Sequence, residues 1–270
     1  MSLRLRCTVR GCVLPLALRG TALACDAGHS FDRAREGYWN LLQPQDRRSD
    51  RPGDRLEALV ARRRWLGEGF ASGLIAALRE VVGALDVDPG RAAIDVGCGE
   101  GTITQGIGRP FCGIDLSTSA IRMAARLNPQ GTWIVANADR GLPFEDGSVA
   151  LALSVFGRRP VAELARVLPP GAALVVVVPG PDDLLELREA VKGLGVRRDR
   201  AVEVAAELAG IAEPVATRRW QHRARHDRRA LEDALAMSYR GERLPERRRL
   251  EGLEALDVTL SASILAMRRT

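Results

Sequence analysis

Short apolar runs alternate with amphipathic stretches through the middle of the chain. Runs of this length that are apolar on both faces are typical of strands in a parallel sheet. They predict strands at residues 92–97, 111–115, 132–136, 149–155 and 172–178. Amphipathic stretches predict helices at 101–108, 117–127 and 160–168, and one from Asp182 or Asp183, as the N-cap, to about Leu194. The alternation predicts an α/β fold with a doubly wound parallel sheet.

The two ends of the chain follow other patterns. A strand at 215–224, a helix at 227–237 and a strand at 256–267 predict an antiparallel closing hairpin. Residues 56–85 look helical, with an interruption near Gly67–Gly73. The first 43 residues instead hold short β-like pieces and turn glycines. We therefore divide the chain into a small module at 1–43, a linker and helical segment at 44–85, and a main domain at 86–270.

A glycine-rich loop follows the first strand of the main domain. Asp95 is followed by Gly97, Gly99 and Gly101 at alternate positions, and a helical pattern comes next. Glycine lets a chain turn sharply and lets a ligand approach the backbone closely. The spacing differs from the dinucleotide pattern G-x-G-x-x-G and lacks the Gly-Lys ending of a phosphate-binding P-loop. It resembles motif I of the class I S-adenosylmethionine (SAM) methyltransferases.

A second acid supports this resemblance over an ordinary strand–helix turn. Asp115 ends the next predicted strand, where an acid accepts hydrogen bonds from ribose hydroxyls in nucleotide-binding sheets. The resemblance implies SAM as cofactor, bound at the ends of three successive strands. The expected cofactor-binding residues are Asp95, Gly97, Cys98, Gly99, Gly101, Asp115, Leu116, Asn137 and Ala138.

Four ligand-type residues gather in the small module. Cys7, Cys12, Cys25 and His29 lie within 23 residues, which suits a closed, structural tetrahedral zinc site. A module this small needs such a metal for stability. The C-x4-C spacing is looser than a usual zinc knuckle, so unligated cysteines in a small β module are the alternative. Five cysteines in a reducing compartment argue against a disulfide framework.

A more specific resemblance follows from the strings after Cys25. Residues 25–32 (CDAGHSFD) and 34–42 (AREGYWNLL) resemble the zinc-binding N-terminus of the large-subunit (23S) rRNA guanine-N1 methyltransferases. Pro52-Gly53-Asp54, Ala61-Arg62-Arg63 and the stretch 179–187 match the same family. The resemblance implies a zinc-ribbon-like module on a class I methyltransferase, a structural zinc ion, methylation of guanine N1, an rRNA hairpin as partner, and relatives that confer resistance to tylosin-type macrolides.

The chain departs from that family where a substrate base should lie. An aromatic-Ala-Pro element after the fourth strand is replaced by Val155–Pro160, and the family's C-terminal Met-Thr/Gly-Pro-aromatic stretch is replaced by Met237–Gly241. The alternative is therefore a SAM-dependent enzyme acting on a small molecule of a biosynthetic pathway. A non-catalytic SAM-fold binding protein is a third class, which the intact motif I disfavours.

The catalytic residues are less defined than the cofactor site. Phe156, Arg158 and Arg159 are the candidates, because they follow the strand end where the methyl acceptor lies in this fold. The two arginines would hold a phosphate or polarise a carbonyl, and an ordinary surface arginine pair is the alternative. His222 and His226 stand four apart, which suits metal ligands on a helix but is also common on solvated surfaces. The sequence assigns no catalytic base.

Charge and hydropathy extend this interpretation. The net charge of +6 suits a polyanionic partner such as RNA, although an arginine-rich codon bias is an equal explanation. A basic segment could follow an RNA backbone or simply be a solvated linker and helix face: Arg47, Arg48, Arg51, Arg55, Arg62, Arg63 and Arg64. No apolar run approaches the roughly 20 residues of a membrane helix, and the N-terminus lacks a signal-peptide core. We expect a cytoplasmic protein without a membrane partner, and a homodimer remains open.

Overall fold

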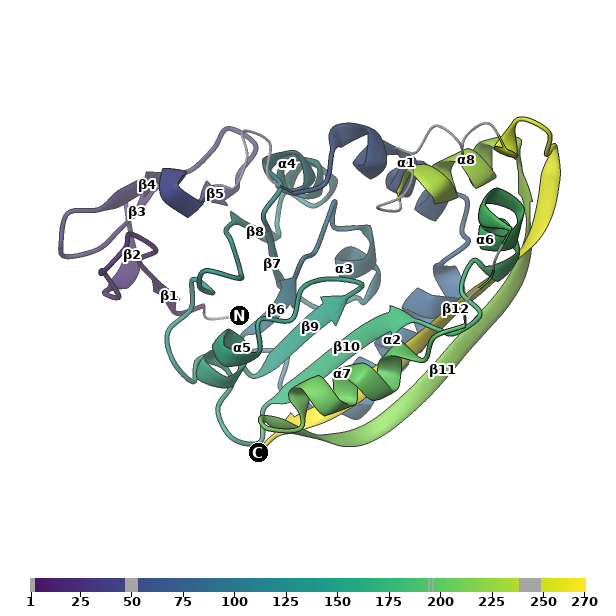
Figure 1. Ribbon diagram of the computed structural model, residues 1–270. Helices are drawn as coiled ribbons and strands as arrows, with labels where there is room; N and C mark the ends of the chain where they lie inside the picture. The colour runs from purple at the N-terminus through teal and green to yellow at the C-terminus, as the bar shows by residue number, and fades with distance from the viewer. Residues whose placement is uncertain (1–2, 47–52, 194, 196, 238–248) are drawn as a thin grey trace.

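The computed structural model describes residues 3–46, 53–193, 195, 197–237 and 249–270, and it contains two sheets. An eight-stranded mixed sheet has the order β11-β12-β10-β9-β6-β7-β8-β5 (Figure 1). Its members are β5 (Trp39–Asn40), β6 (Ala93–Val96), β7 (Cys112–Asp115), β8 (Thr132–Val135), β9 (Leu151–Val155), β10 (Ala173–Pro179), β11 (Ala212–Asp227) and β12 (Ala255–Arg269).

Six of these strands are parallel, and the last two are antiparallel. The strands β10, β9, β6, β7, β8 and β5 pair in parallel, whereas β12 pairs antiparallel with both β10 and β11. The predicted doubly wound sheet and antiparallel closing pair are therefore confirmed.

Helices cover both faces of the large sheet (Figure 1). They are α1 (Leu56–Gly67), α2 (Ser72–Ala84), α3 (Thr102–Gly106), α4 (Thr118–Leu127), α5 (Val161–Val167), α6 (Leu185–Lys192), α7 (Arg200–Leu208) and α8 (Arg228–Ala236), with a 3-10 turn, η1, at Pro44–Asp46. Within β10, Leu174 and Val176 pack in one core while Val175 and Val177 pack in the other. This two-sided burial explains why β10 is an uninterrupted apolar run.

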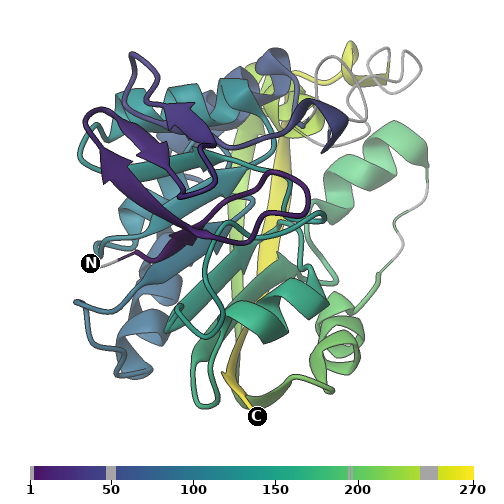
Figure 2. The same ribbon diagram turned by 90° about the vertical axis from the view of Figure 1, so that its left-hand side faces the viewer.

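The N-terminal module forms a second sheet beside the large one. Strands β1 (Leu5–Arg6), β2 (Pro15–Arg19), β3 (Ala22–Ala24) and β4 (Ser30–Asp32) pair antiparallel in chain order. Figure 2 shows these strands in front of the large sheet. Strand β5 leaves the module and pairs with β8, and module residues such as Phe31 share one buried core with Ile134 of β8. The first 43 residues are thus built into the edge of the large sheet.

Several local predictions differ from the structure. The N-cap of α6 is Leu184, in a left-handed conformation, and neither Asp182 nor Asp183 caps the helix; Asp183 instead accepts a hydrogen bond from the Ser261 backbone N–H at 2.9 Å. The capping prediction was wrong because it considered only local partners and ignored β12. Helix α7, capped by Asp199, was not predicted at all. Within the described ranges, no helix is long and apolar enough to cross a membrane.

Candidate functional site

The glycine-rich loop connects β6 to α3 at the carboxyl edge of the large sheet. Gly97, Gly99 and Gly101 all have positive φ, at 79°, 59° and 85°. A Cβ on residue 101 would lie 2.9 Å from the Trp133 ring, and one on residue 97 would lie 3.3 Å from Gly157. Only glycine therefore fits this loop. At Gly99 a Cβ would meet only the Arg62 guanidinium, at 3.3 Å. Gly99 thus presents bare backbone on the side of the loop that Arg62 covers.

Two carboxylates border this loop, one half-buried and one buried. Asp115, at the end of β7, accepts hydrogen bonds from the backbone N–H of Gly99 (3.0 Å) and of Ser117 (2.8 Å). Asp95 in β6 is 2% exposed and accepts a hydrogen bond from the Thr104 hydroxyl, while its second oxygen, Oδ1, is buried without a partner. Burial raises the pKa of Asp95 to about 7, and the charges of Asp115 and Glu100 act in the same direction.

The other expected cofactor residues have different surroundings. The Cys98 side chain is buried among Tyr38, Ile121 and Trp133, so only its backbone takes part in the loop. Leu116 follows Asp115 and packs on the same cluster. Asn137 and Ala138 follow β8, where the Asn137 side chain accepts the Asp139 backbone N–H at 3.1 Å. The structure thus brings the expected residues to the carboxyl ends of β6, β7 and β8.

Phe156 has the most unusual geometry of the three catalytic candidates. It follows β9 with φ of 54°, and 48% of its surface is exposed although it is a large aromatic residue. Its backbone N–H donates to Val177 at 2.9 Å, which helps to hold the left-handed turn. Backbone strain of this kind is concentrated at functional sites. The neighbouring Gly157 lies against Gly97, so Phe156 stands beside the glycine-rich loop.

The two arginine candidates are both ion-paired. Arg158 binds Asp139 with N···O distances of 3.2 and 2.7 Å, and its side chain is 71% exposed. Arg159 binds Glu207 at 3.3 Å and donates to the Gly157 carbonyl at 3.1 Å. Neither guanidinium is therefore in the unpaired state that a role in substrate binding would favour.

Sequence reasoning missed a polar group above the loop. Arg62 of α1 binds Asp54 at 2.8 Å and lies against Gly99, and Glu100 is buried close by. The sequence had placed Arg62 in an RNA-facing basic segment. Two strings that resemble the family, Pro52-Gly53-Asp54 and Ala61-Arg62-Arg63, supply this ion pair, so their joint presence was the usable signal.

Among the described residues of the predicted basic segment, two arginines are held by acids. Arg64 makes a two-point ion pair with the buried Asp233 of α8, and Arg62 is occupied by Asp54. Arg47, Arg48 and Arg51 lie outside the described residues, as does most of the C-terminal stretch Met237–Gly241 that was expected near the substrate base. The sequence analysis did not foresee these two ion pairs, and contact of the segment with RNA stays a prediction.

The four predicted metal ligands converge in the module. One ligand atom from each of Cys7, Cys12, Cys25 and His29 lies within 4.8 Å of all the others. The Cys12 and Cys25 sulfurs are 3.9 Å apart, and His29 Nδ1 lies 3.5 Å from both the Cys7 and the Cys25 sulfur. Tetrahedral zinc with Zn–S bonds near 2.3 Å requires S···S edges of about 3.8 Å. The donor set and its spacing therefore fit zinc.

A turn reconciles the long first spacing with this geometry. The Cys12 backbone N–H bonds to the Val9 carbonyl at 2.9 Å, and Gly11 adopts φ of 79°. These features fold the four intervening residues back so that Cys12 faces Cys7. Burial raises the pKa of the Cys7 thiol to about 12. A cation bound at this site would favour its thiolate form.

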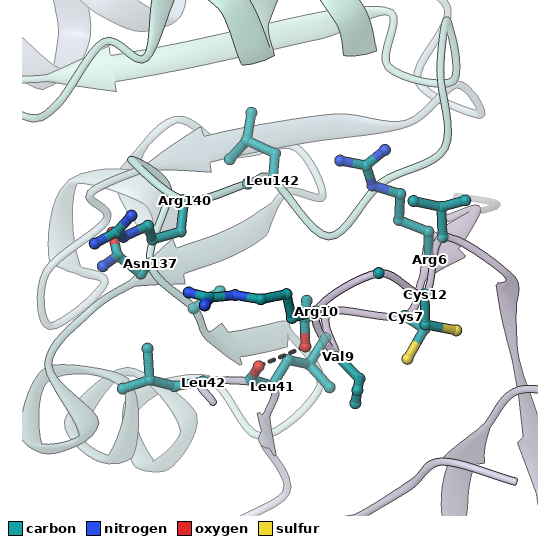
Figure 3. Close-up of a pocket in the computed structure, with 15 residues that line it drawn as sticks. Arg6, Cys7, Val9, Arg10, Cys12, Leu41, Leu42, Asn137, Arg140 and Leu142 are labelled. Carbon is teal, nitrogen blue, oxygen red and sulfur yellow. Dashed lines mark hydrogen bonds between the residues drawn. The ribbon is translucent and has the colours of Figure 1, made fainter. Parts of the chain in front are cut away.

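A pocket of about 290 Å³ lies between the module and the carboxyl edge of the sheet. Residues 6–13 form one wall, Leu41 and Leu42 another, and residues 136–137 and 140–142 the third. Figure 3 shows Arg10 extending from the module loop toward Asn137 and Arg140. Arg10 and Arg140 are exposed and have no ionic partner among the residues that the structure describes.

The histidine pair is not a metal site. His222 and His226 lie on strand β11 rather than on a helix, and His222 is exposed. His226 is fully buried, where Nε2 accepts the Trp65 indole N–H at 3.1 Å and the ring stacks on Phe70 at 4.0 Å. Both sequence interpretations of the pair were wrong for His226, which belongs to the core between α1 and the long hairpin.

Comparisons with known proteins agree with this geometry. A family described as "Methyltransferase domain" matches residues 93–171, and one described as "RlmA, N-terminal" matches residues 6–50. The solved structure of the YcgJ protein from Bacillus subtilis superimposes with a TM-score of 0.52 at 13% identity, covering 73% of this chain and 98% of that one. At this identity the likeness concerns the fold alone. Fold, glycine loop and domain match together define a class I methyltransferase.

Sequence relatives define the family more narrowly. The chain is 35% identical over 235 residues to the 23S rRNA (guanine(748)-N(1))-methyltransferase of Streptomyces fradiae, which covers 84% of this chain and 82% of that one. It is 31% identical over 268 residues to YxjB of Bacillus subtilis, covering 92% of each; the name of that protein assigns it 23S rRNA guanine-N1 methylation provisionally. The chain belongs to the family of 23S rRNA guanine-N1 methyltransferases.

Proposed function

We propose that this enzyme methylates N1 of a guanine in a large-subunit rRNA hairpin, with SAM as methyl donor. The observation that carries the proposal is the pocket between the metal-binding module and the methyltransferase sheet. Arg10 and Arg140, which have no ionic partner within the described ranges, both line this pocket beside the carboxyl edge of the sheet. No feature of the described residues favours a small-molecule acceptor in the same way.

The cofactor fits the residues of the carboxyl edge. SAM supplies an activated methyl group on a sulfonium cation. The bare backbone at Gly99 would allow its close approach, and Asp115 has remaining acceptor capacity for ribose hydroxyls. The unpartnered Oδ1 of Asp95 suits a cationic or N–H donor. Leu116, Asn137 and Ala138 would border the adenine, since they end the next two strands.

Phe156 is our candidate for holding the acceptor base. Single-stranded bases in RNA are commonly bound by stacking on aromatic side chains. Phe156 is half exposed beside the glycine loop, in the backbone conformation described above. Stacking would fix the guanine plane and exclude water from the reacting edge, and positioning of this kind is the main contribution of an enzyme to methyl transfer.

The zinc module would serve as an RNA clamp. Zinc held by Cys7, Cys12, Cys25 and His29 would fix the loop that carries Arg10. Guanidinium groups bind phosphate oxygens, and loops and bulges are the usual targets of sequence-specific RNA readers. Resistance to macrolides, which the resemblance to the family implies, stays a prediction for this protein.

The test combines methyl transfer and binding. Radiolabelled SAM is incubated with unmethylated 23S rRNA fragments and, separately, with a metabolite extract, and the product is identified by nucleoside mass spectrometry. We expect N1-methylguanosine in the rRNA. Label in a small molecule and none in RNA would instead establish the alternative acceptor.

Charge reversal separates the clamp from the general charge of the protein. Arg10→Glu with Arg140→Glu should weaken RNA binding and reduce the slope of log affinity against log salt by about two units. The matched control is Arg91→Glu, an exposed arginine before β6 at the opposite edge of the sheet. SAM affinity should be unchanged in both variants. Equal losses in both would refute a specific clamp.

A further inference from the structure

Arg62 occupies a position above the cofactor loop that its place in a basic segment does not explain. Its side chain is 27% exposed, and Nη2 binds Asp54 at 2.8 Å. Nη1 lies 3.3 Å from where a Cβ of residue 99 would stand. One donor edge of the guanidinium therefore holds a carboxylate, while the other faces the glycine loop at Gly99.

The segment that carries Arg62 is anchored to the cofactor edge. Gly53, with φ of 85°, lies so close to Ser117 that a Cβ would be 2.7 Å from the serine Cβ. The Ser117 hydroxyl donates to the Asp54 carbonyl at 3.1 Å, and the Ser117 N–H donates to Asp115. Asp54 and Asp115 are thus fixed by the same residue, and the Arg62–Asp54 pair sits in a defined position relative to the loop.

The charges around Arg62 are otherwise acidic. Burial alone would lower the pKa of Arg62, but the carboxylates of Asp54, Glu100 and Asp115 outweigh it and raise the pKa. Asp95 adds a further acid below the loop. SAM carries a sulfonium and an ammonium cation, which such acids favour, and one carboxylate, which they repel. The carboxylate therefore needs a local cation, and Arg62 lies beside the loop at Gly99.

We propose that Arg62 forms a carboxylate-binding subsite for the methionine end of SAM, with Nη1 as donor and Asp54 as the residue that orients the guanidinium. The proposal rests on the SAM-dependent activity proposed above, but it is independent of the RNA substrate. Arginine suits the role because its planar fork binds two carboxylates through different edges. Arg62 consequently distinguishes SAM from adenosine compounds that lack the amino-acid carboxylate.

Calorimetry with two ligands tests the subsite. Decarboxylated SAM differs from SAM only in lacking the carboxylate. The wild type should bind SAM at least about tenfold tighter than the decarboxylated compound, as expected for a charge-assisted hydrogen bond. Arg62→Met should lose that preference by weakening SAM alone. Arg63→Met, at the next position of the same helix, should retain both affinities.

The outcomes separate this proposal from the enzyme's general function. A wild type that binds both ligands equally would overturn the subsite while leaving SAM binding intact. An Arg62→Met variant that weakens both ligands by the same factor would show that Arg62 only supports the loop. A wild type that binds neither ligand would refute the SAM-dependent function as well. Thermal unfolding of Arg62→Met, compared with the wild type, excludes loss of fold as the cause.

Discussion

The carboxylate of Asp115 accepts the backbone N–H of Gly99 at 3.0 Å, so the acid after β7 holds the tip of the loop that follows β6. Asp115→Ala should therefore disturb the loop and remove the expected acceptor for ribose hydroxyls. We predict that SAM binding weakens by about 1.5–3 kcal/mol, the usual magnitude for hydrogen bonds to charged groups. Calorimetry measures the change.

Asp88→Ala is the matched control for this variant. Asp88 accepts the Gly90 N–H at 2.8 Å in the turn before β6, at the amino edge of the sheet. It should alter thermal stability without altering SAM affinity. If Asp115→Ala and Asp88→Ala bind SAM equally well, Asp115 has no role at the cofactor site.

Local sequence signals predicted the parts of this molecule whose causes are local. The glycine loop was predictable because only glycine tolerates its three positive φ angles. The metal cluster was predictable because its ligand chemistry is specific, although its long first spacing needed the turn at Gly11. The helix predicted from residue 117 does begin there, with Ser117 as the N-cap of α4 that accepts the Ala120 N–H.

Features that depend on distant partners were not predictable. Arg62 and Arg64 looked alike within one basic run, yet Asp54 holds the first and Asp233, 169 positions from Arg64, holds the second. The sequence alone predicted a surface or metal-binding role for His226, whereas in the structure its ring bonds to Trp65 and stacks on Phe70. The partners of Arg64 and His226 lie far away in the chain on other elements, and a single sequence contains no signal that pairs them. Asp54, by contrast, stands eight positions before Arg62, in a string that the family resemblance had already marked.

The ionisation of Asp95 predicts a pH dependence of cofactor binding. Its folded-state pKa is raised to about 7 by burial, so a fraction is protonated near neutral pH. A bound cation favours the carboxylate, so SAM binding should release a proton and SAM affinity should fall as pH decreases below about 7. Calorimetry in buffers of different ionisation enthalpy measures the released proton.

Asp95→Asn is the control for that profile. This variant should bind SAM more weakly, and its SAM affinity should lack the decrease below pH 7 that Asp95 causes. Any pH dependence that it retains comes from other groups, such as the ammonium group of SAM. A wild-type affinity that is constant between about pH 6 and 8 would contradict the prediction.

The metal site predicts a second measurable property. Protein purified without chelator should contain zinc in a one-to-one ratio, and Cys25→Ser should remove it. Because Cys25 and Phe31 share a core with the large sheet, the variant should also lower the thermal unfolding temperature. SAM binding should persist, since the glycine loop packs on a different cluster. Cys112→Ser, a buried cysteine outside the cluster, should keep its zinc; equal zinc loss in both variants would contradict the ligand assignment.

The buried imidazole of His226 predicts loss of stability in mild acid. Burial lowers its pKa below the ordinary value near 6.5, while Asp227 opposes and His222 reinforces that shift. Between the two pKa values the unfolded chain binds more protons than the folded one, so the free energy of unfolding should decrease as pH falls from about 6.5 and level off below the folded-state pKa. Protonation would also replace the Nε2 acceptor of the Trp65 indole N–H by a donor.

Urea unfolding at several pH values measures how the free energy of unfolding changes with pH. The control variant His226→Gln keeps an amide acceptor but does not titrate, so it should lack this decrease. If the wild type and His226→Gln lose stability in parallel below pH 6.5, another group is responsible.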